Sequence, residues 1–404
     1  MSIAQDEPGA QFRLSMLLND TRYRGYTFQA VALLALIAFM AYLGVNLVQN
    51  LAAAGLNISY QFLGEPAGYD INQRLVEYTS QSTHWRAAVV GVLNTLLVAF
   101  VGCFLATVIG VFVGILRLSK NWLIRQLTSV YVEIFRNVPV LIWILIVMQI
   151  FIVVLPQPRD FKGANASASM WFDAFAFTGR GFYTPKPIWM DGSWVVVAVF
   201  LASILGVFAF RQYAKTRLYR DGVMLERFWT SLGILFVPCL VVYFIMGQPI
   251  GLDYPALKGF NFKGGVYMRN SFIALTFALS IYTAAFIAEN VRAGILAVSK
   301  GQTEAAASLG LRPNRIMNLV ILPQALRVII PPLISQYLNL TKNSSLAIAV
   351  GYMDLTGTLG GITLNQTGRA IETVLLLMLF YLTISLSISF IMNIYNNAVK
   401  LKER

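Results

Sequence analysis

Ionisable side chains interrupt several of the long apolar stretches of this sequence. Glu133 and Arg136 are three residues apart, so they would share one face of a helix and could form an ion pair. The same spacing separates Glu289 from Arg292. A charge at the centre of a bilayer costs about 2.5–3.5 kcal/mol on insertion scales, so such groups must face protein or water. We interpret both pairs as structural contacts, and we keep a gating contact as the alternative for Glu133 and Arg136.

A third charge in an apolar region, Lys342, lies in the polar segment 339–345 together with Asn343 and Ser344. A buried ammonium beside hydroxyl and amide groups could bind a carboxylate. It could equally tie two helices together through backbone carbonyls, and the sequence leaves both alternatives open. These three residues are our first candidates for a pathway that a polar molecule could follow.

Asn94 and Thr95 are weaker candidates for the same pathway. Polar residues in membrane helices often serve only to hold helices together through hydrogen bonds. Glu289 is also kept as a pathway candidate, because its charge is close to the inner end of an apolar stretch.

The motifs of common catalytic and cofactor sites are missing from the sequence. It contains no G-x-x-x-x-G-K-[ST] phosphate loop, so we do not expect this chain itself to hydrolyse ATP. The sole histidine, His84, stands beside Trp85 without a second His or Cys at ligand spacing, so we expect a surface or interface residue and no metal site. We therefore expect a chain that is not an enzyme and binds no cofactor.

Composition places these residues in a membrane protein. Hydrophobic residues make up 57% of the chain and charged residues only 12%, which is about half the usual share. The net charge of +13 could suggest nucleic-acid binding, but the Lys and Arg residues lie at the edges of apolar stretches rather than in one block. That placement favours contact with membrane lipid and argues against nucleic acid.

The apolar stretches predict an all-α, polytopic membrane protein with about eight transmembrane helices, because a span needs about 20 mostly apolar residues. The seventh is the weakest, since Pro331 and Pro332 interrupt its start. The stretches run near residues 26–49, 88–116, 127–155, 193–212, 228–247, 270–291, 328–350 and 371–396.

The distribution of positive charge predicts the orientation. Cytoplasmic loops retain Lys and Arg, and the richest clusters, at residues 211–227 and 292–327, fall on the inner side if the N-terminus is cytoplasmic. The even number of spans then places both termini inside. Trp85, Trp189 and Trp194 fall at predicted outer boundaries, as expected of an interfacial aromatic belt.

The loop between the sixth and seventh spans, residues 300–327, carries the most informative pattern. Residues 303–309 favour a short helix, Gly310 can end it in a left-handed conformation, and Pro313 can begin a second helix. This pattern predicts a helix-turn-helix on the cytoplasmic face, with exposed Ala305, Ala306 and Ala307 that allow close approach of a partner. Pro323 is expected to break the chain before the next span.

Glu304, Ala305, Ala306 and Gly310, followed by Leu322-Pro323, closely resemble the EAA signature of ABC importer permeases. The departure is Val320, where that signature usually has Ile. Three further segments resemble the polar amino acid branch of these permeases: LSIYTAAFIAENVRAGILAVSKGQTEAA at 279–306, YVEIFRNVPVL at 131–141 and LNLTKNSSLA at 338–347.

The resemblance implies a type I ABC importer permease core. It also implies a function, the import of polar or general L-amino acids across the inner membrane, in which a coupling helix within 300–325 docks on an ATPase subunit. The implied partners are a second permease subunit, two nucleotide-binding subunits and a periplasmic amino-acid-binding protein. We expect the two permeases to form a heterodimer, and the sequence leaves a second copy of this chain open as the alternative partner. The alternative is an ion-coupled secondary transporter, in which intramembrane Glu133, Glu289 and Lys342 would relay ions.

The chain is longer than a minimal member of that family and resembles the elongated general L-amino acid permeases. We expect a cytoplasmic segment at 1–25 and an extra span with a periplasmic loop at 26–84. Two core parts would lie at 85–155 and 269–398. Between them lies an insertion with two spans at 156–268, whose outer stretch 156–192 is expected to be a capping loop with an aromatic re-entrant turn or a contact for an external partner.

Overall fold

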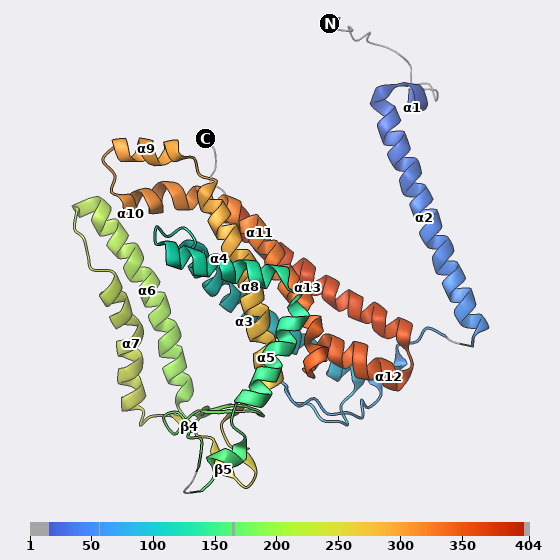
Figure 1. The fold of residues 1–404 in the computed structure, drawn as a ribbon, viewed down its shortest axis with the longest axis horizontal. Helices are drawn as coiled ribbons and strands as arrows, with labels where there is room; N and C mark the ends of the chain where they lie inside the picture. The colour runs from blue at the N-terminus through green and yellow to red at the C-terminus, as the bar shows by residue number, and fades with distance from the viewer. Residues whose placement is uncertain (1–15, 56, 164–165, 400–404) are drawn as a thin grey trace, which may run out of the picture. The chain divides into compact units, whose positions relative to one another are not determined.

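The computed structural model describes residues 16–55, 57–163 and 166–399 (Figure 1). Eight helices in this part of the chain are long and apolar enough to cross a membrane, which confirms the predicted number of spans. Residues 1–15 of the predicted segment 1–25 lie outside the described residues, and so do residues 400–404. The eight candidate spans are Tyr23–Ala53, His84–Leu116, Val140–Phe161, Ser193–Asp221, Phe228–Ile245, Asn270–Leu296, Pro313–Val350 and Ala370–Asn397.

The chain forms two compact units, Met1–Leu63 and Gly64–Arg404. In the first, the short helix α1 (Met16–Asn19) precedes α2 (Thr21–Ala53), and almost every described side chain of α2 is exposed. A 3₁₀ turn, η1 (Gln61–Gly64), lies at the boundary between the units.

The loop that follows, residues 64–83, belongs to the second unit. Its buried Tyr69, Ile71 and Tyr78 pack with Ala87 and Val90 of the next helix. We predicted that this loop belongs with the first span, whereas these three side chains are buried against the second unit.

Helices α3 (His84–Leu116) and α8 (Asn270–Leu296) form the centre of the second unit. Their backbones approach closely where α3 has glycines. A Cβ atom added at Gly110 would lie 2.6 Å from the Cβ of Ile287, and one at Gly114 would lie 2.8 Å from the carbonyl oxygen of Ala288. Small residues at such crossings are the usual means of packing membrane helices. Helix α8 is therefore the most deeply buried of the eight.

The third span differs from its predicted range of 127–155. The chain forms α4 (Trp122–Asn137), breaks at Val138-Pro139, and continues as α5 (Val140–Val154). Proline disfavours a helical conformation in the residue before it, which explains the break. Asn121 caps α4 by accepting hydrogen bonds from the backbone N–H groups of Leu123 and Ile124. Residues 127–137 thus belong to a separate helix.

The insertion contains short strands that the sequence analysis did not predict. A 3₁₀ turn, η2 (Pro158–Phe161), is followed by β1 (Ala176–Thr178), β2 (Gly181–Thr184) and β3 (Lys186–Trp189). The strands β4 (Ile250–Asp253), β5 (Ala256–Lys258), β6 (Asn261–Lys263) and β7 (Val266–Arg269) lie after two helices. Antiparallel pairing gives the sheets β1-β2-β7, β3-β4 and β5-β6. The aromatic stretch before β1 forms a tight turn, closed by two backbone hydrogen bonds between Trp171 and Phe175, and the segments after it pair as strands.

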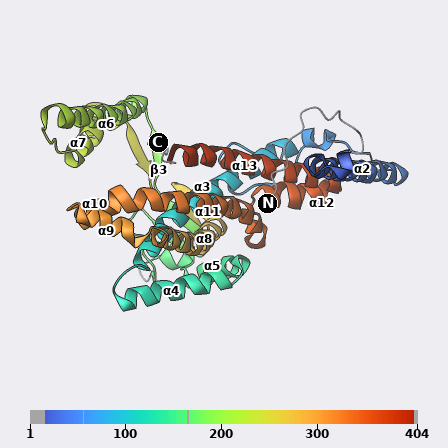
Figure 2. The same ribbon diagram turned by 90° about the horizontal axis from the view of Figure 1, so that it is seen from above.

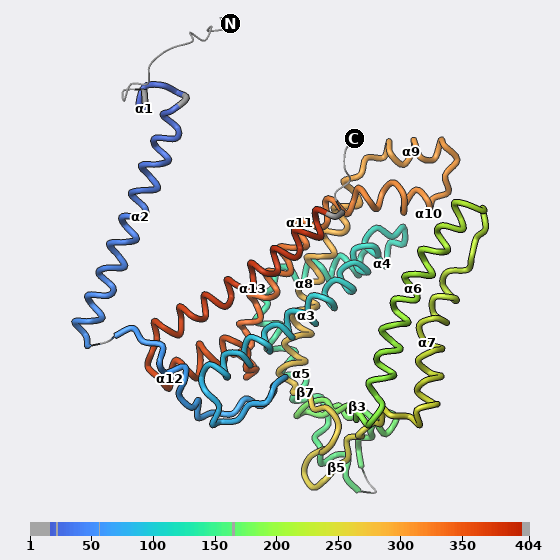
Figure 3. The backbone as a smooth tube through the Cα atoms, turned by 180° about the vertical axis from the view of Figure 1, so that it is seen from behind, coloured from blue at the N-terminus to red at the C-terminus, as the bar shows by residue number. Residues whose placement is uncertain are grey.

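The two additional spans are α6 (Ser193–Asp221) and α7 (Phe228–Ile245), which form an antiparallel hairpin (Figure 1). Figure 2 shows the two helices together, to one side of the other helices of the second unit. Figure 3 shows the strands at the end of the second unit opposite α9 and α10, while the turn between α6 and α7 lies at the same end as those two helices.

The chain then runs through α9 (Lys300–Ser308), α10 (Pro313–Ile316), the π-helix η3 (Met317–Ile321) and α11 (Leu322–Asn343). Pro323 does not break the chain as expected. It lies in the first turn of α11 directly after the π-helix, where a missing N–H is tolerated. Pro331 and Pro332 also lie inside α11 without ending it.

The C-terminal part consists of the 3₁₀ helix η4 (Ser344–Val350), the π-helix η5 (Thr356–Thr363), α12 (Leu364–Thr367) and α13 (Ala370–Val399). Leu355 and Leu359 are buried between Ala88 of α3 and the side chains of α13 around Phe380. The η4–α12 segment is thereby held against α3.

Candidate functional site

A short helix with an exposed surface lies between α8 and α11. Helix α9 ends as the sequence predicted, since Gly310 has a φ of 77°, a conformation that favours glycine. Pro313 then begins α10 at its first position. The predicted helix-turn-helix is present.

The exposed surface of α9 includes Glu304, Ala305 and Ala307, with Leu309 following at 80% exposure. Ala306 is different from the expectation, because only 5% of it is exposed. Its carbonyl oxygen accepts a hydrogen bond from the N–H of Leu311, at 3.4 Å, as the chain turns back. The close approach of a partner can therefore involve two of the three alanines.

Lys342 is exposed, and it lies in the last turn of α11 rather than in the middle of a buried span. Asn343 is half-buried, while Ser344 is buried and its hydroxyl donates to the carbonyl oxygen of Thr341 at 2.8 Å. The expectation of a buried ammonium is therefore wrong for the single chain.

An exposed polar stripe on α11 consists of Ser335, Asn339 and Lys342. Their spacing of four and three residues places them on one helix face. Polar side chains are costly in contact with lipid tails, so this face favours water or another protein chain as its neighbour. Ser335 was missed in the sequence analysis, although its helical spacing from Asn339 was a usable signal.

Asn94 and Thr95 are fully buried and hold the segment after η4 against α3. The amide of Asn94 donates to the carbonyl oxygens of Gln73 and Met353, both at 2.8 Å. The hydroxyl of Thr95 accepts the N–H of Leu355 at 3.1 Å. These hydrogen bonds join α3 to the backbone of the segments around Gln73 and Met353, which is a structural role.

Glu289 is the centre of a charge cluster between α3 and α8. Its carboxylate accepts a hydrogen bond from the guanidinium of Arg292 at 2.6 Å, as the spacing predicted. It also accepts one from Arg117, which no local sequence pattern indicates. Arg117 is the more buried partner, with 10% of its side chain exposed against 33% for Arg292.

Glu133 and Arg136 do not form the predicted ion pair. Among the described residues, the guanidinium of Arg136 lies over the ring of Phe286, 5.4 Å from its centroid. The amide of Asn137 donates to the carboxylate of Glu133 at 3.4 Å. Both charged residues are exposed on α4, so they can point in different directions at little cost.

A buried carboxyl group, Asp354, was not identified from the sequence. It lies between the seventh and eighth spans and accepts hydrogen bonds from the N–H of Gly357 at 2.8 Å and the hydroxyl of Tyr381 at 3.1 Å. Burial raises the pKa of Asp354 to about 6, because the charged form loses its hydration. Nearby, the hydroxyl of Tyr352 donates to the carbonyl oxygen of Asn94 at 3.2 Å. The result is a polar layer that connects α3, η5 and α13.

His84 is buried rather than exposed at a surface or interface, which corrects the prediction. Its Nδ1 lies 3.1 Å from the hydroxyl of Thr363, which ties the start of α3 to the end of η5. Within the described residues, no three His, Cys, Asp or Glu side chains are grouped as metal ligands would be.

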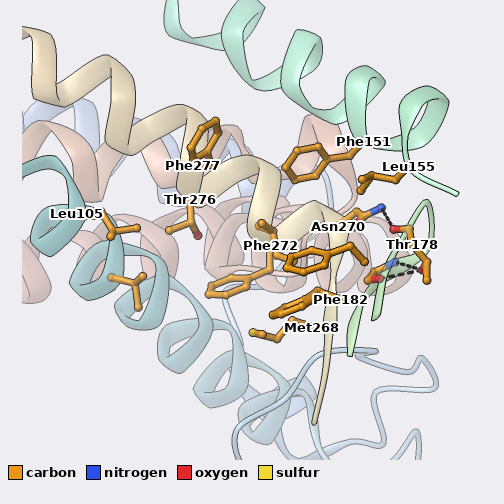
Figure 4. Close-up of a pocket in the computed structure, with 14 residues that line it drawn as sticks. Leu105, Phe151, Leu155, Thr178, Phe182, Met268, Asn270, Phe272, Thr276 and Phe277 are labelled. Atoms are coloured by element: carbon orange, nitrogen blue, oxygen red, sulfur yellow. Dashed lines mark hydrogen bonds between the residues drawn. The ribbon is translucent and has the colours of Figure 1, made fainter. Parts of the chain in front are cut away.

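An apolar cavity of about 510 Å³ lies between α3, α5, α8 and the sheet β1-β2-β7 (Figure 4). Phe151, Phe182 and Phe272 line it, and its polar groups come from Thr178, Thr276 and Asn270. Asn270 donates to the carbonyl oxygen of Thr178 at 3.1 Å. No ionisable side chain lines this cavity, so it does not suit a charged ligand.

Comparison with known proteins is consistent with this arrangement. Residues 227–401 match the family described as binding-protein-dependent transport system inner membrane component. The chain is 52% identical to the glutamate/glutamine/aspartate/asparagine transport system permease protein BztB of Rhodobacter capsulatus, with 100% of both chains covered. It is 43% identical to the general L-amino acid transport system permease protein AapQ of Rhizobium johnstonii, covering 98% of this chain and 96% of that one.

Among solved structures, a chain of an amino acid ABC transporter crystallised with histidines overlaps 78% of this chain and 95% of its own length, with 20% identity and a TM-score of 0.45. The full-length relatives carry the assignment. No hydrogen bond or ion pair among the described residues connects Glu133, Glu289 and Lys342, so nothing here supports an ion relay. This chain belongs to the binding-protein-dependent inner membrane components and is an amino-acid ABC transporter permease.

Proposed function

We propose that this chain works as the permease subunit of an importer of L-amino acids, with acidic amino acids and their amides among its substrates. The names of two full-length relatives support this range, since one is a glutamate/glutamine/aspartate/asparagine transport system permease and the other a general L-amino acid transport system permease. The partners are a second, different permease subunit, two nucleotide-binding subunits that hydrolyse ATP and a periplasmic amino-acid-binding protein.

The chain lies in the inner membrane with both termini in the cytoplasm. The support is the positive charge of the loops, which is concentrated on the side of α9 and of the α6–α7 turn. The proposed domain roles keep the core at 85–155 and 269–398, with the first span and the 156–268 insertion as additions.

The observation that carries the proposal is the exposed surface of α9. Glu304, Ala305 and Gly310 are exposed at the end of the deeply buried α8, so a force applied to α9 acts on the centre of the helix bundle. Docking of α9, with Leu322 and Pro323 at the base of the loop, on a nucleotide-binding subunit would couple ATP-driven closure to rocking of the spans.

The pathway follows the polar stripe of Ser335, Asn339 and Lys342, at the interface with the second permease subunit. A lysine exposed on the single chain becomes enclosed when the partner covers this face, and its ammonium can then bind the carboxylate that all amino acids share. Asn343 borders this stripe, whereas Asn94, Thr95 and Ser344 support the backbone behind it.

Substitution of Gly310 tests the coupling role. A Cβ at this position meets no atom within 4 Å, so Gly310→Asp adds charge and backbone strain without disturbing internal packing. In proteoliposomes with the partner subunits, we expect the variant to be present in normal amount and ATP-driven uptake to fall at least tenfold. Gly368→Asp is the matched control, since Gly368 has a φ of 64° and equally open surroundings on the opposite side.

Normal uptake by Gly310→Asp would refute docking through α9. Equal losses in both glycine variants would mean that local strain, not docking, is responsible. Uptake by the wild-type chain without any ATPase subunit would refute the proposed function itself.

A further inference from the structure

The ends of α6 and α7 that face the side of α9 flank an open cavity, all of whose lining residues are exposed. It has a volume of about 570 Å³, and its wall consists of three cations, one amide and two phenyl rings, contributed by Arg211, Lys215, Arg227, Gln212, Phe208 and Phe228. No carboxylate lines it. A smaller hollow of about 350 Å³ beside it shares Gln212 and Lys215 and adds Tyr219 and Arg220.

The three cations that line the cavity have no paired carboxylate in the described part of the chain. Among the described residues, no hydrogen bond or ion pair involves the side chains of Arg211, Lys215 or Arg227. The neighbouring Arg217 and Arg220, by contrast, both pair with Asp221, at 2.5 Å and 3.0 Å. The cavity is therefore a concave site of positive charge that would attract an anion.

The position of the cavity along α6 corresponds to a membrane surface. A helix of 29 residues is about 43 Å long, whereas the hydrocarbon core is about 30 Å thick. The last turns of α6 therefore extend beyond the hydrocarbon, and Arg211 and Lys215 lie where the helix leaves it. Phe208 and Phe228 are each 65% exposed on the bilayer side of these cations, and Trp229 follows, as in an interfacial aromatic belt.

We propose that this cavity binds the headgroup of an anionic phospholipid. The guanidinium groups of Arg211 and Arg227 and the ammonium of Lys215 would bind the phosphate oxygens, because arginine offers paired donors to such a group. The rings of Phe208 and Phe228 would contact the glycerol and the first part of the acyl chains. Basic pockets between membrane helices on this side are typical sites for anionic lipids.

The combination of cations and phenyl rings distinguishes lipid from a soluble protein partner. A subunit approaching from the aqueous side could pair with the cations but would leave both rings uncovered in the bilayer. A lipid can cover the cations and the rings at once. Its phosphate and its acyl chains follow one another along the helix axis in the same order as the cations and the rings. The proposal does not depend on which amino acids the chain transports.

The test uses the assembled transporter purified in a neutral detergent. Phosphatidylglycerol and phosphatidylcholine with identical acyl chains are titrated while bound lipid is counted by native mass spectrometry and the midpoint of thermal unfolding is followed. We expect phosphatidylglycerol to bind at least tenfold more tightly than phosphatidylcholine.

The variant Arg211→Gln/Lys215→Gln/Arg227→Gln should lose this preference. The matched control is Lys186→Gln/Lys258→Gln/Lys263→Gln, which removes the same charge from exposed lysines of the insertion strands. The control should keep the preference. The variant Arg211→Lys/Arg227→Lys should keep at least part of the preference for phosphatidylglycerol. Its binding would also show that an α6–α7 hairpin altered at these positions still folds.

Four results would overturn the proposal. These are equal binding of the two lipids, equal losses in the two glutamine variants, an equal effect of inorganic phosphate at the same concentration, and release of a protein subunit by the cavity variant with lipid binding unchanged. The phosphate result would identify a site for a free anion, and the last result a protein-docking surface.

Discussion

Arg117, at the end of α3, donates a hydrogen bond to the carboxylate of Glu289 on α8, across 172 positions of sequence. This contact joins the two helices that form the centre of the core, at the end of α8 from which α9 extends. The shorter-range partner of Glu289, Arg292, is on the same helix and fixes no tertiary contact. The contact between Arg117 and Glu289 therefore does more than the contact with Arg292 to hold α3 and α8 together at this end of the bundle.

Replacement of Arg117 should destabilise the protein more than replacement of Arg292. Arg117→Gln removes the more buried partner of Glu289 and leaves part of a carboxylate charge uncompensated, which costs about 1.5–3 kcal/mol. Arg292→Gln removes a partner that is one-third exposed, and solvent screens its effect. Thermal unfolding of the two purified variants compares them directly, and an equal or larger effect of Arg292→Gln would contradict the assigned order.

The buried carboxyl group of Asp354 predicts a pH-dependent stability. Because the pKa of Asp354 is raised to about 6 from an ordinary value of 3.8, the folded protein binds this proton more tightly than the unfolded chain. The free energy of unfolding should therefore rise as pH falls from about 6 towards 4, by up to about 3 kcal/mol from this group.

Asp354→Asn isolates that effect. The amide oxygen of asparagine can still accept the N–H of Gly357, and its NH₂ can donate to Tyr381, so the contacts are kept without the charge. The variant should unfold at a higher temperature than the wild type at pH 7.5, and the difference should close at pH 4.5. Parallel unfolding temperatures at both pH values would show that Asp354 does not titrate in this range.

Two glycines in membrane helices should respond to alanine in opposite directions. Gly110→Ala places a methyl group 2.6 Å from Ile287 and should force α3 and α8 apart, with a cost of about 1–3 kcal/mol. Gly233 of α7 has no atom within 4 Å of the added Cβ, so Gly233→Ala should be neutral or stabilise by up to about 1 kcal/mol. Unfolding temperature and yield of folded protein measure both. A tolerated Gly110→Ala would contradict the close α3–α8 contact.

Charge at Lys342 should matter for transport but not for stability. Lys342 is exposed on the single chain, so Lys342→Met should leave the unfolding temperature unchanged. Loss of a hydrogen bond between two charged groups should lower uptake of amino acids in proteoliposomes by about 10- to 100-fold.

Lys342→Arg keeps the charge and should retain part of the uptake, while Lys258→Met in β5 serves as a control that removes a distant exposed lysine. If Lys342→Met transports normally, the polar stripe of α11 is not the pathway.

The amino-acid sequence alone determined the features that depend on local chemistry. Eight apolar stretches identified eight spans, because backbone groups in lipid must be satisfied within each helix. Gly310 and Pro313 determined where α9 ends and α10 begins. The spacing of Glu289 and Arg292 allowed their contact, although the same spacing did not pair Glu133 with Arg136. Each of these features involves residues within a few turns of one another.

Only the tertiary structure decided the features that join distant segments. The strands β2 and β7 pair Gly181 with Arg269 across the whole α6–α7 hairpin, and no local pattern indicates such a partner. Burial of Asp354 depends on Tyr381 of α13, and exposure of Lys342 depends on which face of α11 the core covers. The charge of a side chain is written in the sequence, whereas its hydration and its partners follow from packing, so burial and long-range contacts had to be read from the fold.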